Sequence, residues 1–276
     1  MEEGQISVLL GHNGAGKSTI MNMLTGMLAA DAGDCYIYGH SIRNELRAVR
    51  QEIGYCPQHN VLWPELTCEE HLNFFASIKG LDGEARDTAI TTMLRAVDLE
   101  EKRHYRSSAL SGGQKRKLCV AMAFVGGCRL VFLDEPTAGM DVGARRHTWE
   151  LLQKMSSDHT ILLTTHFMDE ADLLGHKIAI MSNGSLQCQG SSLFLKSRLG
   201  VGYTLVLSVQ PNVNPHSLAQ GIQNFVPQAE LMSAGTGEIC FRVPTASLSV
   251  LPPLLAELES NGPLWGVNNF TLRKSS

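Results

Sequence analysis

The segment Gly11–Thr19 constrains the fold of this chain more than any other feature. It reads GHNGAGKST and matches the pattern GxxxxGK[ST], whose glycines let the backbone curl so that successive N–H groups face phosphate oxygens. The apolar run Ile6–Leu10 predicts a buried strand before it, and Lys17–Leu28 predicts a helix after it. The alternative is a glycine-rich turn that matches by chance, and the flanking strand and helix argue against it. The predicted phosphate-binding residues are Gly11, Asn13, Gly14, Gly16, Lys17, Ser18 and Thr19.

A second segment complements the first. Leu130–Glu135 is an apolar run that ends in two carboxylates. Beside a phosphate loop, Mg²⁺ needs hard oxygen ligands, which the Ser18 hydroxyl and Asp134 can supply. Glu135 lies one residue further on, where it could polarise a water for attack on a phosphorus atom. A strand that simply leaves the core could also end in acids. The two motifs together predict a nucleotide triphosphatase.

Apolar runs alternate with helical patterns along the first two thirds of the chain. Runs rich in β-branched and aliphatic residues predict buried strands, and longer periodic stretches predict helices. Strands that alternate with helices imply an α/β fold with a mostly parallel sheet and helices on both faces. The expected strands are Ile6–Leu10, Leu130–Leu133, Thr160–Thr164 and Lys177–Met181, and the expected helices are Lys17–Leu28, Arg86–Ala96, Gln114–Val125 and Ala144–Met155. Asn183-Gly184 predicts a tight hairpin turn.

The pattern changes beyond a boundary expected near residues 191–202. From there we expect strand 203–209, helix 215–225, strands 228–233 and 238–243, helix 252–260 and strand 265–272. This βαββαβ order is typical of a small ferredoxin-like α+β domain. The domains predicted from the sequence are therefore residues 1–195, with the phosphate loop, and residues 203–276.

Charge, cysteine content and hydropathy exclude several other classes. The formal net charge of −4 argues weakly against nonspecific nucleic-acid binding. The seven cysteines are scattered and never spaced as CxxC, which favours free buried thiols in a reducing compartment over disulfides or a zinc site. The start of the chain has no basic segment of the kind found in signal peptides. No stretch approaches the roughly 20 apolar residues that span a bilayer, so the chain as given is expected to be soluble.

Leu110–Gln114 reads LSGGQ and lies between the phosphate loop and the acidic strand. Alone, it could be an ordinary helix N-cap and loop. With Gln58 in GYCPQ, Asp141 in PTAGMD and His166 in TTH, the chain carries these motifs in the order found in ATP-binding cassettes, and it resembles that family closely. Their positions match the family's Q-loop, D-loop and switch histidine.

The resemblance implies a composite site that binds Mg²⁺ and ATP. Two cassettes would associate head to tail, and each ATP would lie between one phosphate loop and the partner's signature segment. It further implies contacts to nucleotide from Ser111, Gly112, Gly113, Gln114 and Asp141. Glu135, His166 and Gln58 would serve catalysis, and Gln58 would join Ser18 and Asp134 around the metal.

Two stretches of the sequence resemble the A subfamily of transporters more closely. They are the stretch after His166, HFMDEADLLGHKIAIMSNGSLQCQG, and NVLWPELTCEEHL after Gln58. That resemblance implies an ATPase motor for lipid transport, on the cytoplasmic face of a membrane and held there by transmembrane domains outside this chain. Asn60–Leu72 lies where such cassettes receive their membrane domains, with Trp63 and Leu66 as candidate contacts. Trp63 could equally belong to the local core.

Other cassette classes fit less well. Only 92 residues separate Lys17 from Leu110, without sustained heptads, so the long coiled coil of chromosome-maintenance ATPases has no place. Repair cassettes carry zinc modules, for which the cysteine spacing is wrong. The alternatives that stay open are a soluble cassette that acts as a switch in translation or complex assembly, and a module that binds ATP without hydrolysing it.

The family pattern also has an aromatic residue before the phosphate loop that stacks on adenine. Only ten residues precede Gly11 here, and none of them is aromatic. We therefore expect the chain to lack the first strands of a cassette and to be part of a longer protein. Base stacking contributes about 1–3 kcal/mol in comparable contacts. The chain alone is therefore expected to bind ATP roughly one to two orders of magnitude more weakly than the intact cassette.

Overall fold

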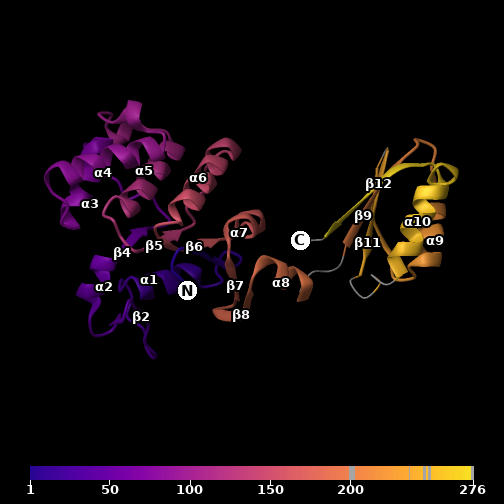
Figure 1. The fold of residues 1–276 in the computed structure, drawn as a ribbon, viewed down its shortest axis with the longest axis horizontal. Coiled ribbons are helices and arrows are strands. Elements are labelled where there is room, and N and C mark those ends of the chain that lie inside the picture. The colour runs from indigo at the N-terminus through magenta and orange to yellow at the C-terminus, as the bar shows by residue number, and fades with distance from the viewer. Residues whose placement is uncertain (199–202, 236, 245–246, 248–249, 275–276) are drawn as a thin grey trace. The chain divides into compact units, whose positions relative to one another are not determined.

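The computed structural model describes residues 1–198, 203–235, 237–244, 247 and 250–274 (Figure 1). The chain divides into two compact units, Met1–Ser192 and Leu193–Ser276. Helix α8 (Ser192–Arg198) lies at this division. Leu199–Gly202, with the glycines expected to mark the boundary, lie outside the described residues.

The first unit is built on a six-stranded sheet in the order β4-β5-β6-β1-β7-β8. Neighbouring strands from β4 to β7 are parallel, and β8 closes the edge in antiparallel pairing with β7. The strands are β1 (Ile6–Leu10), β4 (Ile53–Cys56), β5 (Leu130–Asp134), β6 (Thr160–Thr165), β7 (Lys177–Ser182) and β8 (Ser185–Gly190). The expected mostly parallel α/β sheet is confirmed, and Asn183-Gly184 joins β7 to β8 with both residues at positive φ.

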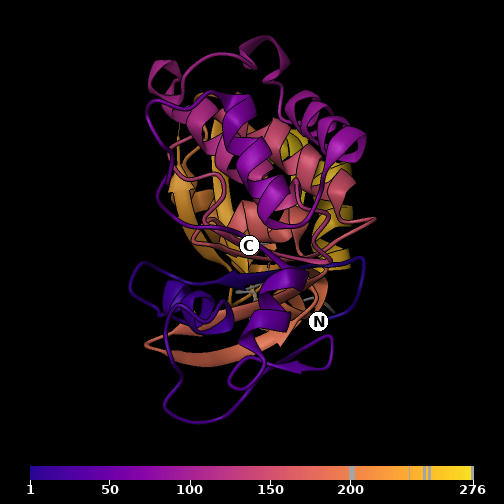
Figure 2. The same ribbon diagram turned by 90° about the vertical axis from the view of Figure 1, so that its left-hand side faces the viewer.

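Side chains along each strand point alternately to the two faces of the sheet, and helices pack against both faces. Ile53, Leu130 and Phe132 share a buried cluster with Met21 of α1 and Val49 of α2. The intervening Gly54 faces the opposite way, close to α5. The helices of this unit are α1 (Lys17–Leu24), α2 (Leu46–Glu52), α3 (Cys68–Ile78), α4 (Gly83–Ala96), α5 (Gly112–Phe124), α6 (Val142–Met155) and α7 (Met168–Leu174), and a small β2–β3 ribbon joins Tyr36–Ile37 to His40–Ser41. Figures 1 and 2 both show α3, α4 and α5 gathered on one side of the unit, away from α1 and α2.

Helix α1 is shorter than the sequence pattern predicts. It was expected over Lys17–Leu28 but ends at Leu24, with Thr25 as its C-cap. Gly26 adopts a left-handed φ of 69°, and the amide of Leu28 bonds back to the carbonyl of Asn22. A side chain at Gly26 would lie 2.2 Å from Leu46 Cδ1, so α2 packs where the helix would otherwise continue.

The second unit has the expected βαββαβ order. Its strands are β9 (Tyr203–Val209), β10 (Glu230–Ala234), β11 (Glu238–Val243) and β12 (Val267–Lys274), and its helices are α9 (Pro215–Phe225) and α10 (Leu251–Asn261). The sheet is antiparallel in the order β10-β11-β9-β12, and both helices cover one face (Figure 1). Leu205, Leu207, Ile222, Phe241 and Leu254 belong to a core of its own. The ferredoxin-like prediction is confirmed, and Pro252 and Pro253 lie in the first turn of α10.

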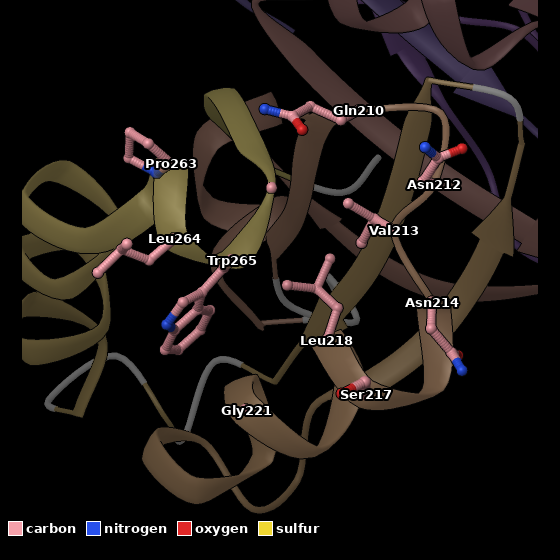
Figure 3. Close-up of a pocket in the computed structure, with 11 residues that line it drawn as sticks. Gln210, Asn212, Val213, Asn214, Ser217, Leu218, Gly221, Pro263, Leu264 and Trp265 are labelled. Carbon is pink, nitrogen blue, oxygen red and sulfur yellow. The ribbon is translucent and has the colours of Figure 1, made fainter.

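A pocket of about 610 Å³ opens at one end of this unit (Figure 3). It lies between the start of α9 and the turn before β12, and its lining mixes amide side chains such as Asn212 and Asn214 with the indole of Trp265. Gly221 makes room for that indole, since a Cβ there would lie 3.3 Å from the ring. None of the residues that line the pocket carries a charge.

All seven cysteines are free thiols, four of them buried and three half-buried. The expectation of buried thiols therefore holds for Cys56, Cys68, Cys119 and Cys128 only. Within the described ranges, no helix is long and apolar enough to span a membrane.

Candidate active site

The phosphate loop follows β1 directly and is shaped by its glycines. Gly14 and Gly16 have φ values of 83° and 99°, which side chains disfavour. Gly11 comes so close to β7 that an added Cβ would lie 2.6 Å from the carbonyl oxygen of Met181. Its amide donates to the carbonyl of Thr165 at 3.2 Å, so the loop starts beside the end of β6. Gly16 is the N-cap of α1 and has no side chain to cover the free amides of the first turn.

Lys17 is the first residue of α1 and is only 5% exposed. Its ammonium group donates to the carbonyls of Gly11 and His12, at 2.8 and 3.2 Å. It also lies 3.4 Å from Oε1 of Glu135. The three acceptors match the three hydrogens of the ammonium, which holds a positive charge at the mouth of the loop.

Glu135 follows the last residue of β5 and has an unusual backbone conformation. Its φ of 49° is left-handed, which turns its carboxylate back toward the loop. Its amide donates to the backbone and side-chain oxygens of Thr164, at 3.2 and 3.0 Å. The Thr164 hydroxyl in turn donates to Oδ1 of Asp134 at 2.5 Å. Thr164 thus holds the Asp134 carboxylate and the Glu135 backbone amide from the neighbouring strand.

His166 completes a row of three functional side chains. It follows β6, and its Nδ1 lies 3.2 Å from Oε2 of Glu135. The imidazole is about a third exposed, at 32%, whereas the Glu135 side chain is 8% exposed. The Glu135 carboxylate therefore bridges Lys17 on one side and His166 on the other.

The remaining predicted site residues lie elsewhere on the surface. Gln58 is exposed two residues beyond β4. Ser111 is the exposed N-cap of α5, where it forms a capping box with Gln114, and no hydrogen bond or ion pair in the described part of the chain links residues 111–114 to the phosphate loop. Asp141 caps α6, and hydrogen bonds from backbone amides there hold the pKa of its carboxyl below the usual range.

Two residues at the site carry no motif that the sequence alone revealed. Thr164 opens the TTH segment quoted for His166, and its own signal is only a hydroxyl at the expected end of a central strand. Arg116 lies in α5, 2% exposed, and donates to the carbonyls of Asp134, Glu135 and Pro136. A buried arginine among polar helix residues gives no sequence signal of its own.

The arrangement fits a magnesium nucleotide. Free amides at the start of α1, a buried ammonium and a glycine-rich loop suit phosphate groups. A magnesium ion takes oxygen ligands, and the Asp134 carboxylate is 2% exposed, with Thr164 occupying only one of its two oxygens. The fold and the site therefore define a P-loop nucleotide-hydrolase type of protein.

Comparisons with known proteins agree with this class. The ABC transporter family model matches residues 1–138, and an ACT-like domain model matches residues 203–275. The phospholipid-transporting ATPase ABCA3 of Mus musculus is 48% identical over 97% of this chain and 16% of its own length. An ABC transporter A family member of Dictyostelium discoideum is 42% identical over 99% of this chain and 18% of its own length. This chain thus spans less than a fifth of these relatives.

Solved structures show the same fold. An ATP-binding subunit of an ABC transporter superposes with a TM-score of 0.66 at 29% identity, covering 72% of this chain and 83% of that one. A dimeric ATP-binding cassette bound to ADP and Pi, in a post-hydrolysis state, gives 0.64 at 25% identity, covering 69% and 87%.

The chain belongs to the ABC transporter family. The resemblance to the A subfamily is confirmed by its relatives.

Proposed function

We propose that this chain is the ATP-hydrolysing motor segment of a lipid transporter that acts on the cytoplasmic face of a membrane. The observation that carries the proposal is the contact of Glu135 with both Lys17 and His166 at the mouth of the phosphate loop. The A-subfamily relatives, two of which are named as phospholipid-transporting ATPases in mouse and human, support lipid as the cargo.

The site residues divide the chemistry among them. Gly11, Asn13, Gly14, Gly16 and Thr19 cradle the phosphates with their backbone amides, and Lys17 pairs with the β- and γ-phosphates. Ser18, Asp134 and Gln58 hold Mg²⁺, which when bound neutralises charge on the phosphate oxygens.

Once phosphate oxygens replace the carboxylate at Lys17, Oε1 of Glu135 is free to accept a proton. Glu135 then takes that proton from a water as the water oxygen bonds to the γ-phosphorus and the bond to ADP breaks. The imidazole of His166, about a third exposed beside Glu135, orients the γ-phosphate and this water.

A second cassette completes the site. Ser111, Gly112, Gly113 and Gln114 lie at the exposed N-terminus of α5, and Asp141 lies at the exposed N-terminus of α6. Both helix ends can receive an anion or a partner's backbone. We propose that these residues meet the nucleotide bound by a partner in a head-to-tail dimer, and the dimeric ATP-binding cassette among the structural neighbours supports this.

Transmembrane domains outside this chain would dock beside the Q-loop. Trp63, Pro64, Glu65, Leu66 and Phe74 line an exposed pocket of about 290 Å³ there. Trp63 is 43% exposed and packs edge-on against Phe74 at 5.1 Å, so it serves the local packing and the surface at once. The membrane association of the chain is then indirect, and nucleic acid has no part in it.

The domain assignments follow from the same proposal. Residues 1–195 act as the ATP-binding domain and residues 203–276 as a regulatory-type α+β domain, consistent with the two compact units and the two family models. A switch in translation or complex assembly is disfavoured by the transporter relatives.

Replacement of Glu135 tests the core of the proposal. Glu135→Gln removes the proton acceptor but keeps the shape, so we expect turnover of Mg-ATP to fall at least 100-fold while ATP binding persists. ATP should then hold two chains together, measured as a dimer by sedimentation. In the Glu135→Gln background, Ser111→Arg should abolish that dimer because it blocks the partner's phosphates. Retained turnover in Glu135→Gln would exclude Glu135 as the base, and an ATP-bound dimer that survives Ser111→Arg would contradict the composite site.

A further inference from the structure

Arg116 lies buried at the junction of three catalytic segments. It belongs to the second turn of α5, five residues after Ser111, and is 2% exposed. Its Nε donates to the carbonyl of Pro136 at 3.1 Å. One terminal nitrogen donates to the carbonyls of Asp134 and Glu135, at 2.5 and 3.0 Å.

The other terminal nitrogen reaches a different segment. It donates to the carbonyl of Pro57 at 2.5 Å, and to the side-chain oxygen of Asn60 at the outer limit of 3.5 Å. A guanidinium carries five N–H groups. Each of the five therefore has an acceptor, three at the end of β5 and two in the segment around Gln58.

All five acceptors are carbonyl or amide oxygens. A buried cation is costly unless its hydrogen bonds are made, and replacement by well-packed apolar side chains is often tolerated in protein cores. A requirement for packing alone would not select an arginine here. The geometry instead matches a need to hold backbone carbonyls of two segments around one planar group.

The segment held most firmly is the one that carries the catalytic carboxylates. Glu135 has a left-handed φ of 49°, a conformation that non-glycine residues keep only when the surroundings enforce it. Arg116 binds its carbonyl from one side, while Thr164 accepts its amide hydrogen from the other. This pair of contacts directs the Glu135 carboxylate toward Lys17 and His166.

The same guanidinium connects this segment to the Q-loop and to the signature helix α5. Pro57 directly precedes Gln58, and α5 begins with the signature glycines. We propose that Arg116 is a positioning residue: it locks the signature helix, the base of the Q-loop and the backbone of Asp134–Pro136 into one unit, and thereby sets the turnover number. The proposal rests on the proposed ATPase function. Arg116 itself touches no nucleotide and acts through the segments that it holds.

Substitutions that differ in hydrogen-bonding geometry test this. Lysine keeps the charge but cannot span acceptors arranged around a planar fork. We expect Arg116→Lys to lower kcat for Mg-ATP at least 10-fold with KM within 3-fold, and Arg116→Met to lower kcat further. Gly11–Thr19 is untouched, so ATP binding by calorimetry should stay within 3-fold.

Lys79→Met provides the matched control. Lys79 donates to the carbonyls of Arg50, Gln51 and Ile53 at the opposite end of β4, at 2.6, 3.4 and 2.5 Å. Its loss removes a comparable set of carbonyl contacts without touching the site, so kcat should stay within 2-fold. A kcat for Arg116→Lys that matches the wild type, or falls no further than that of Lys79→Met, overturns the proposal.

Hydrogen exchange separates this proposal from the proposed function. Arg116→Lys should speed amide exchange in peptides that cover residues 57–61 and 134–138, and Lys79→Met should not. If the wild-type chain hydrolyses no ATP, the proposed function fails, and the exchange comparison still decides whether Arg116 holds these segments. Unchanged exchange in both peptides overturns the proposal whatever the turnover.

Discussion

At the scale of residues, the site depends on side chains that hold the backbone and side chains of the catalytic residues. Thr164 orders Asp134 and the amide of Glu135, and Arg116 holds the carbonyls behind them. Glu170, the fourth residue after His166, likewise holds Thr137 and Trp149 by hydrogen bonds. Each of these groups is buried, so its polar contacts have no competition from water.

Glu170 offers a direct test of such a contact. Its Oε1 accepts hydrogen bonds from Thr137 at 2.8 Å and from the indole of Trp149 at 2.9 Å, and its side chain is fully buried. Glu170→Ala leaves both donors unpaired, so we expect a loss of about 2–5 kcal/mol in the free energy of unfolding. Chemical denaturation measures this loss.

Glu170→Gln is the control for that change. Its amide oxygen can accept both bonds, and Oε2 of the native carboxylate already has no hydrogen-bond partner among the described residues. The expected loss for glutamine is about 1 kcal/mol or less. Equal losses for alanine and glutamine would show that the two hydrogen bonds contribute nothing.

At the scale of elements, close contacts between backbones place the signature helix. A Cβ at Gly54 of β4 would lie 1.9 Å from the carbonyl oxygen of Ala123 in α5. Glycine at this position lets α5 approach the sheet closely enough for Arg116 to reach the end of β5. The sequence predicted α5 from its periodicity, but it gave no expectation of β4, α2 or α3.

Gly54→Ala should therefore separate α5 from the sheet. Because the obstacle is backbone, we expect a loss of about 1–3 kcal/mol in the free energy of unfolding, together with reduced turnover. Gly112→Ala, where an added Cβ meets no atom within 4 Å, is the control for stability. Its effect should stay within about 0.5 kcal/mol. Comparable midpoints of denaturation for the two variants would rule out the close contact.

At the scale of the whole molecule, burial of ionisable thiols couples folding to pH. Burial raises the pKa of Cys56 to about 11 and that of Cys119 to about 12, from an ordinary value of 9.0. Unfolded thiols thus lose protons at a lower pH than folded ones. Their contribution to stability is complete below pH 9 and is lost as the pH rises toward 11 and 12.

The free energy of unfolding should accordingly fall between pH 8.5 and 10. The expected loss from these two thiols is roughly 1 kcal/mol each at pH 10. Denaturation curves across this range measure the slope. The double variant Cys56→Ala, Cys119→Ala should show a shallower slope, although its stability at pH 7 is lower from the lost packing. An unchanged slope would mean that these thiols do not carry the effect.

The sequence by itself determined the phosphate loop, the acidic strand end, the signature segment and the βαββαβ order of the second unit. Each of these is local: a run of glycines, a carboxylate after an apolar strand, or a periodic pattern that hydrophobic burial enforces. The tertiary structure alone decided the end of α1, where Leu46 meets Gly26, and the partners of Glu135. Arg116, Thr164 and Glu170 make their contacts across 18 to 59 residues of sequence. Such contacts form only when the order of the strands brings distant segments together, so no local sequence pattern predicts them.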